Sequence, residues 1–198
     1  MYVTFPVKDS LFLSIFSFDK EIAEDFFNFG CCRHCKSKAL SWSNYNRKPR
    51  GLPKELSQDT LDKYRYRFSF ICRPCRLRTT PPSVRFMGRK VYTALSILWI
   101  SLACEQGISP PLHDLRILME SCLSQQTIER WMRWWQHNVW NCSFWKTFRG
   151  QLLGEIKKNQ IILGVWNHFK QQIMETASLV NAILKFFSPI TRPEIYPF

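Results

Sequence analysis

Two C-x-x-C pairs constrain this chain more than any other feature of its 198 residues. The first pair is Cys32 and Cys35, the second is Cys72 and Cys75, and 36 residues separate them. Each pair can turn tightly so that four sulfurs reach one zinc ion at about 2.3 Å, and an ion with four protein ligands has no position open for a substrate. The pairs therefore predict a structural Zn²⁺ site in a zinc ribbon, with unrelated thiols as the alternative.

The other cysteines need a separate interpretation. Cys31 and His34 adjoin the first pair, and either could replace one of the four ligands. Cys104, Cys122 and Cys142 lie in apolar stretches and are expected to pack as small hydrophobic residues. The chain starts with no signal-peptide pattern, and the apolar stretch at 91–104 is too short to span a bilayer. We therefore expect a reduced, cytoplasmic protein with no membrane segment.

The positive charge is concentrated around the cysteine pairs. Residues 31–90 carry sixteen Lys and Arg against three Asp and Glu, whereas residues 1–30 carry two against five and residues 91–198 carry ten against seven. A localised basic surface with aromatic neighbours is typical of proteins that bind a phosphate backbone. A cationic face that only confers solubility is the alternative. The predicted phosphate contacts are Arg47, Lys48, Arg50, Arg76, Arg78 and Arg85.

Hydrophobic periodicity predicts an α+β fold, in which a small N-terminal zinc ribbon precedes a mainly helical bundle. A strand is expected within residues 1–17 and another over 64–71. Helices are expected over 18–29, 89–104, 112–120, 125–139, 144–157, 160–169 and 173–187, and a further helical stretch within 52–63. The predicted parts are a packing segment (1–30), the ribbon with its basic loop (31–88), a helix-turn-helix (89–140) and a helical segment (141–198).

The helices at 112–120 and 125–139 are joined by a short turn, and Ser124 is a favourable N-cap for the second. The apolar residues of the second helix, such as Trp131, fall on one side of it. Polar side chains near the start of a second helix are typical of a helix-turn-helix, although a plain helical bundle gives a similar pattern. Gln pairs with adenine and Arg with guanine in the major groove. The predicted base contacts are Gln125, Gln126, Arg130 and Arg133.

This arrangement resembles the N-terminal DNA-binding module of zinc-ribbon insertion-sequence transposases of the ISXO2-like group. The strings RKPRG and CRLRTTPPSVRFMGRKVY are similar to small bacterial proteins associated with mobile elements. The resemblance covers roughly residues 31–140. It implies zinc at the four paired cysteines, and duplex DNA bound by the ribbon and by the helix that begins at Gln125.

The chain departs from that group where the transposases continue into a ribonuclease-H-like domain. Three acidic residues there hold two metal ions, but here no Asp follows Asp114. The only later acids are Glu120, Glu129, Glu155, Glu175 and Glu194, on stretches expected to be helical or terminal. We therefore expect the chain to have no enzymatic activity. We expect it to be an accessory factor of a mobile element that works with a separate catalytic transposase.

Two other functions remain open from the sequence. Tyr64, Tyr66 and Phe68 on the predicted strand could stack the bases of single-stranded RNA or DNA. Alternatively, the tryptophan-rich C-terminal half could dock on a catalytic protein partner, in a complex that high salt would not disrupt.

Overall fold

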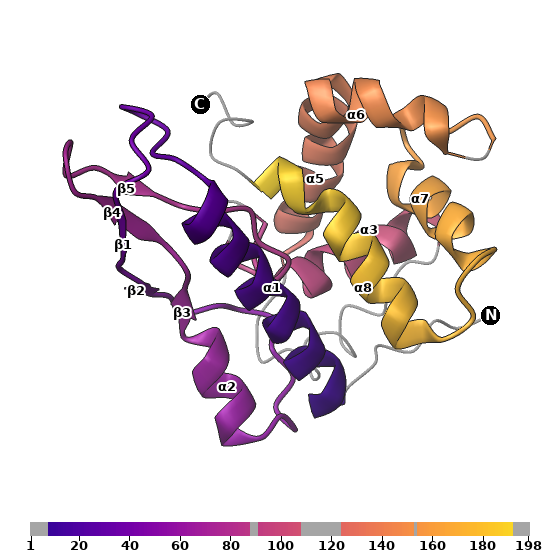
Figure 1. Ribbon diagram of the computed structural model, residues 1–198. Helices are drawn as coiled ribbons and strands as arrows, with labels where there is room; N and C mark the ends of the chain where they lie inside the picture. The colour runs from indigo at the N-terminus through magenta and orange to yellow at the C-terminus, as the bar shows by residue number, and fades with distance from the viewer. Residues whose placement is uncertain (1–7, 88–90, 108–123, 153, 192–198) are drawn as a thin grey trace.

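The computed structural model describes residues 8–87, 91–107, 124–152 and 154–191. Two small sheets lie on one side of the molecule, most of the helices lie on the other, and α1 (Asp9–Phe29) runs between them (Figure 1). The chain is therefore an α+β protein, as predicted. Within the described ranges, no helix has the length and apolar character needed to cross a membrane.

Both sheets are antiparallel. The larger sheet has the order β1-β4-β5 and the smaller pairs β2 with β3. The register of the larger sheet places Leu40 opposite Cys72, so the second cysteine pair starts beside the strand that follows the first pair. The strands are β1 (Leu40–Trp42), β2 (Tyr45–Asn46), β3 (Tyr66–Arg67), β4 (Phe70–Cys72) and β5 (Arg78–Thr79).

The helical side is built around α3, which packs against α5, α7 and α8. Every residue of α3 from Ala94 to Leu102 is buried, as expected for a helix covered on all sides. A π-helical stretch, Trp134–Val139, continues α5, and 3₁₀ turns occupy Arg149–Gln151 and Ser188–Thr191. The remaining helices are α2 (Gln58–Tyr64), α3 (Ala94–Glu105), α5 (Gln125–Arg133), α6 (Ser143–Phe148), α7 (Ile161–Lys170) and α8 (Thr176–Phe187).

Helix α1 connects the two sides because its buried residues recur at helical spacing along one stripe. They are Leu11, Phe12, Ile15, Asp19 and Ala23. The first three belong to the large apolar core around α3. Ala23 instead packs in a smaller apolar cluster beneath the sheet, which also contains the sulfur-bearing residues Cys32 and Cys72.

A buried ion pair fixes α1 to the segment that follows the sheet. Arg85 Nε lies 2.8 Å from Asp19 Oδ2, and both side chains are at most 2% exposed. The Asp19 carboxylate also accepts hydrogen bonds from the Ser83 hydroxyl and the Val84 N–H at 2.6 and 2.7 Å. The Arg85 guanidinium lies within 4.6 Å of the ring centre of Phe68. Hydrogen-bond donors surround the carboxylate and aromatic rings surround the guanidinium, which offsets part of the cost of removing both charges from water.

Three features of the local structure differ from the sequence predictions. A strand within residues 1–17 is wrong for the described part, because α1 begins at Asp9 and buries a helical stripe. The strand predicted over 64–71 is divided into β3 and β4, since Tyr64 ends α2 and its hydroxyl donates inward to the Phe12 carbonyl. The helix predicted over 144–157 ends at Phe148, where a 3₁₀ turn follows. The helix predicted over 112–120 lies outside the described residues.

The stability of the helical side should depend on pH through Glu105. Burial raises the pKa of this carboxyl to about 7, although backbone N–H groups at the start of α7 favour its ionised form. Because the folded-state pKa is raised, the contribution to stability is complete below the unfolded pKa of about 4.3 and is lost as pH rises through 7. We expect wild type to lose about 3 kcal/mol of unfolding free energy from this group between pH 5 and pH 8.

Glu105→Gln removes this titration while keeping a carbonyl that can accept the Leu163 N–H. Denaturant unfolding at each pH, expressed as the difference between wild type and variant, separates Glu105 from other titrating groups. The difference should move steadily in favour of the variant as pH rises. A difference that stays constant from pH 5 to pH 8 would contradict the assignment.

Candidate metal centre and nucleic-acid face

Four cysteine sulfurs converge at the edge of the larger sheet. The Sγ atoms of Cys32, Cys35, Cys72 and Cys75 all lie within 4.8 Å of one another, close enough to bind one metal ion. Sγ of Cys32 lies 3.6 Å from that of Cys75, and Sγ of Cys35 lies 3.4 Å from that of Cys72. Each close contact therefore joins the two pairs, which are far apart in sequence.

The two pairs adopt the same backbone turn. The N–H of Lys36 donates to the Cys32 carbonyl at 2.9 Å, and the N–H of Arg76 donates to the Cys72 carbonyl at the same distance. Lys36 and Arg76 both have φ of 60°, a left-handed conformation that is uncommon for residues other than glycine. The same unfavourable conformation at matching positions indicates that each turn is shaped to direct two sulfurs toward one point.

Backbone hydrogen bonds also act on the sulfurs. Burial opposes ionisation of Cys32, yet the N–H groups of Cys35 and His34 donate to its sulfur and lower the pKa to about 5. For Cys72, the N–H of Cys75 favours the thiolate, but burial and the neighbouring thiols raise the pKa to about 12. Four adjacent thiols cannot all ionise without a cation. A bound metal ion removes this conflict because it stabilises the thiolate form of each ligand.

Cys31 and His34 lie outside this group of four. The His34 side chain is exposed and its Nε2 accepts a hydrogen bond from Arg33 Nε at 3.0 Å. Only the four predicted cysteines therefore come together within the described part of the chain.

Most of the predicted phosphate contacts are accessible. Lys48, Arg50 and Arg76 are exposed, and Arg47 is half-buried beside the Phe86 ring. Arg78 is exposed but already held, since its guanidinium donates to Ser69 Oγ at 2.5 Å and to the Ser43 carbonyl.

The predicted phosphate contact at Arg85 is wrong. The sequence places it in a basic run and predicts a phosphate contact, but its side chain is buried in the ion pair with Asp19. No phosphate can reach it in this fold.

The basic loop at 47–50 is attached next to the first turn of α3. The N–H of Arg50 donates to the Val91 carbonyl and the N–H of Thr93 donates to the Arg50 carbonyl, both at 3.0 Å. Gly51 then has φ of +82°, and a Cβ atom there would lie 2.6 Å from Ser96 Oγ. The RKPRG string therefore ends in a glycine that both the backbone conformation and the available space require.

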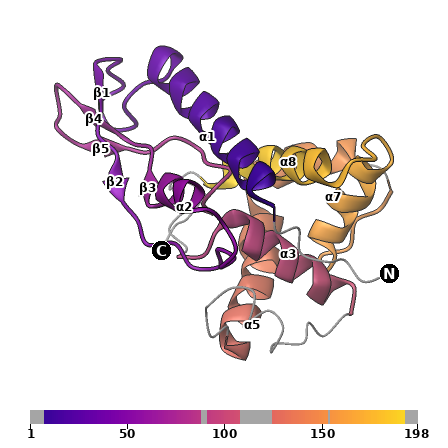
Figure 2. The same ribbon diagram turned by 90° about the horizontal axis from the view of Figure 1, so that it is seen from below.

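Helix α5 exposes the four predicted base-contact residues, Gln125, Gln126, Arg130 and Arg133. Its opposite side buries Ile128 and Trp131, and the Ser124 hydroxyl accepts the Thr127 N–H at 3.2 Å, as a helix N-cap does. Trp131 packs against Tyr92, with ring centres 4.9 Å apart, so α5 lies close to the anchored basic loop. Figure 2 shows α5 at the margin of the helical side.

The aromatic residues predicted to stack bases are mostly inaccessible. Tyr64 is 1% exposed and Phe68 is 6% exposed, because both face the core. Trp42, which the sequence analysis did not select, has 42% of its surface exposed. Its place between Ser41 and Ser43, at the end of β1, was the available signal. The C-terminal residues Trp145 and Trp166 are buried, which favours a role in the core for them.

Neither the family models, nor the curated proteins, nor the solved structures include a match to this chain. The functional interpretation therefore depends on the residues and their geometry.

Proposed function

We propose that this chain is a zinc-stabilised protein that binds duplex DNA and acts as an accessory factor of a mobile element. The observation that carries the proposal is the group of four cysteine sulfurs. Exposed cations at Lys48, Arg50 and Arg76 and the exposed polar face of α5 support it. A separate catalytic partner is part of this proposal.

Zinc is the ion that this donor set fits. Sulfurs at about 2.3 Å from a tetrahedral ion lie about 3.8 Å from one another. The two contacts between the pairs, at 3.4 and 3.6 Å, are close to that separation. All four thiolates belong to the chain, so the ion would stabilise the two turns and leave no position for a substrate. The buried sulfurs of Cys32 and Cys72 would transmit this stabilisation to the cluster beneath the sheet.

The proposed DNA contacts are of two kinds. Lys48, Arg50 and Arg76 are assigned to phosphates, since exposed cations release condensed counterions when they bind a backbone. The start of α5 is assigned to the major groove, where Gln and Arg side chains read base edges. The contact between Tyr92 and Trp131 supports a joint surface, because it holds the basic loop and α5 close together.

The two kinds of contact predict different effects of substitution. Arg130→Ala should cost about 1–3 kcal/mol on a preferred site and relax the sequence preference at the contacted base. Lys48→Ala should weaken binding to all sequences alike and reduce the salt slope by about 1. Affinities for a site selected from random duplexes, and for scrambled duplexes, measured across a salt series, distinguish these outcomes.

Lys158→Ala serves as a control, since Lys158 is exposed and lies outside the proposed surface. It removes the same charge as Lys48→Ala and should leave the salt slope unchanged. If Arg130→Ala and Lys48→Ala had equal effects on every sequence, the assignment of α5 to the major groove would be wrong.

A further inference from the structure

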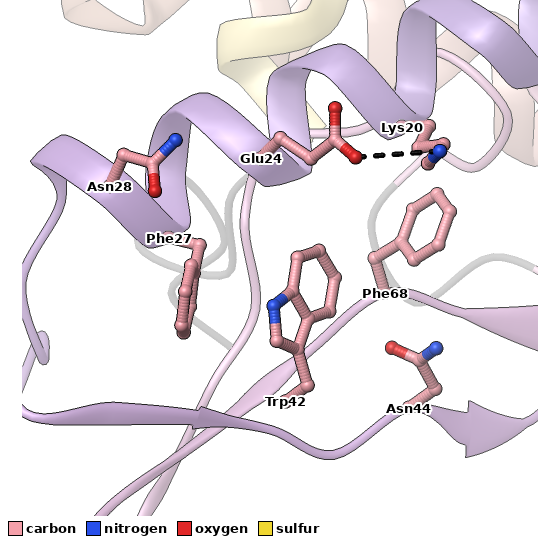
Figure 3. Close-up of a pocket in the computed structure, with 7 residues that line it drawn as sticks. All are labelled: Lys20, Glu24, Phe27, Asn28, Trp42, Asn44 and Phe68. Atoms are coloured by element: carbon pink, nitrogen blue, oxygen red, sulfur yellow. Dashed lines mark ion pairs between the residues drawn. The ribbon is translucent and has the colours of Figure 1, made fainter.

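A hollow of about 550 Å³ lies between α1, the end of β1 and the segments at Asn44 and Phe68 that connect the two sheets. Its volume is in the range of about 300–1,000 Å³ that small-molecule sites occupy. Figure 3 shows Trp42, Asn44 and Phe68 rising toward α1, from which the Phe27 ring points back at them. The ring centre of Trp42 is 5.4 Å from that of Phe27 and 5.9 Å from that of Phe68. The Trp42 ring from β1 and the Phe27 ring from α1 thus border one opening, and the buried Phe68 ring packs beside Trp42.

The polar groups around this hollow are balanced in charge. Lys20 and Glu24 form an ion pair with 3.5 Å between Nζ and Oε1, so their charges offset each other. Asn28 and Asn44 add carboxamides, each with hydrogen-bond donors and an acceptor. The Asn44 Oδ1 atom already accepts a hydrogen bond from the Ser69 N–H at 3.4 Å. The lining therefore suits a flat, uncharged group with both donors and acceptors on its edge.

Cations lie on the other face of the same edge strand. Ser41 and Ser43 alternate with Trp42 and so face away from it. Arg73 Nε donates to Ser41 Oγ at 2.9 Å, and Arg78 donates to Ser43 Oγ at 3.3 Å. Both arginines are exposed. The Trp42 ring and these two arginines therefore lie on opposite faces of the sheet.

We propose that this hollow, here called the Trp42 pocket, binds one unpaired nucleobase of the bound nucleic acid. Bases stack on exposed aromatic side chains and present their Watson–Crick edges only where they are unpaired. The neutral lining fits the base, and the exposed Arg73 beside β1 is assigned to an adjoining phosphate. The inference rests on the proposed binding of nucleic acid and adds a preference for a duplex next to an unpaired nucleotide.

Three DNA probes test the pocket with the full-length, metal-loaded protein. The first is a blunt duplex, the second carries a short thymidine overhang, and the third has the same overhang with abasic sugars. We expect the thymidine overhang to bind more tightly than either of the others by about 5- to 150-fold, the effect of stacking one base. Trp42→Ala should abolish this gain and leave the affinity for the blunt duplex unchanged.

Because Trp42 also packs on Phe70, with ring centres 4.6 Å apart, a second variant is needed. Asn28 is exposed on α1, and Asn28→Ala should reduce the gain without changing the melting temperature. Asn167→Ala, an exposed position on α7, is the matched control and should keep the full gain.

Equal affinities for the thymidine and abasic overhangs would overturn the proposal that the Trp42 pocket binds a base, because only the overhang phosphates would then contribute to binding. The same holds if Trp42→Ala and Asn28→Ala both keep the gain, or if wild type binds none of the probes. Loss of blunt-duplex binding alone, with the base-dependent gain preserved, would instead overturn the proposed duplex contacts.

Discussion

Cys72→Ser should abolish the proposed zinc binding and unfold the two cysteine turns. Cys72 is fully buried and contributes a sulfur to the group of four as well as a side chain to the apolar cluster beneath the sheet. Metal binding in structural zinc sites supplies much of the folding free energy, with apparent values of about 10–16 kcal/mol in small zinc modules. The purified variant should contain no stoichiometric zinc, and a chelator that lowers the melting temperature of wild type should have no further effect on it.

Cys142→Ser is the matched control. Cys142 caps α6 through its sulfur, which lies 3.4 Å from the Trp145 N–H, and a serine hydroxyl can accept the same hydrogen bond. This variant should keep both the metal content and the melting temperature of wild type. If Cys72→Ser also kept them, the four sulfurs would not form a structural metal site.

Asp19→Ala should be the most destabilising substitution outside the cysteines. It leaves the Arg85 guanidinium buried without its carboxylate, and the Ser83 hydroxyl and the Val84 N–H lose an acceptor. Removing one partner of a buried pair costs about 3–5 kcal/mol. For a chain of this size that corresponds to roughly 6–20 °C in melting temperature, which calorimetry or circular dichroism measures directly.

Lys20→Ala on the same helix is the control, because its ion pair with Glu24 is exposed on both sides. Its effect should stay below about 1 kcal/mol. Replacing both buried partners, as in Asp19→Leu with Arg85→Met, should restore much of the loss, since apolar groups of similar size tolerate burial. A melting temperature for Asp19→Ala equal to that of wild type would contradict the structural role of the pair.

The parts that the sequence predicts well are those encoded by local patterns. The C-x-x-C spacing predicts which four of the seven cysteines in the described ranges converge, because each turn needs only neighbouring residues to direct its two sulfurs. The same is true of α5, where Ser124 caps the helix and Ile128 and Trp131 recur on its buried side. Repeating apolar residues also locate α7 and α8 to within a few residues.

The parts that it misses depend on partners distant in sequence. In the sequence, Arg85 is indistinguishable from exposed arginines such as Arg76 and Arg78 until Asp19, 66 residues earlier, is placed against it. One signal was present, because Asp19 lies four residues from both Ile15 and Ala23 on the apolar stripe of α1. A charge in that position predicts a buried partner. Trp42 was not predicted to stack bases for a similar reason, since the packing of α1 against the sheet determines which aromatic ring remains exposed.

The most direct test of the central proposal is a titration of the zinc-loaded protein with random duplex DNA across a salt series, before and after chelation. We expect the logarithm of the binding constant to fall linearly and steeply with the logarithm of salt concentration, as counterion release requires. We also expect chelation to abolish the binding. Absence of binding at low salt, or binding that neither salt nor chelation changes, would contradict the proposal that a metal-stabilised basic surface binds the DNA backbone.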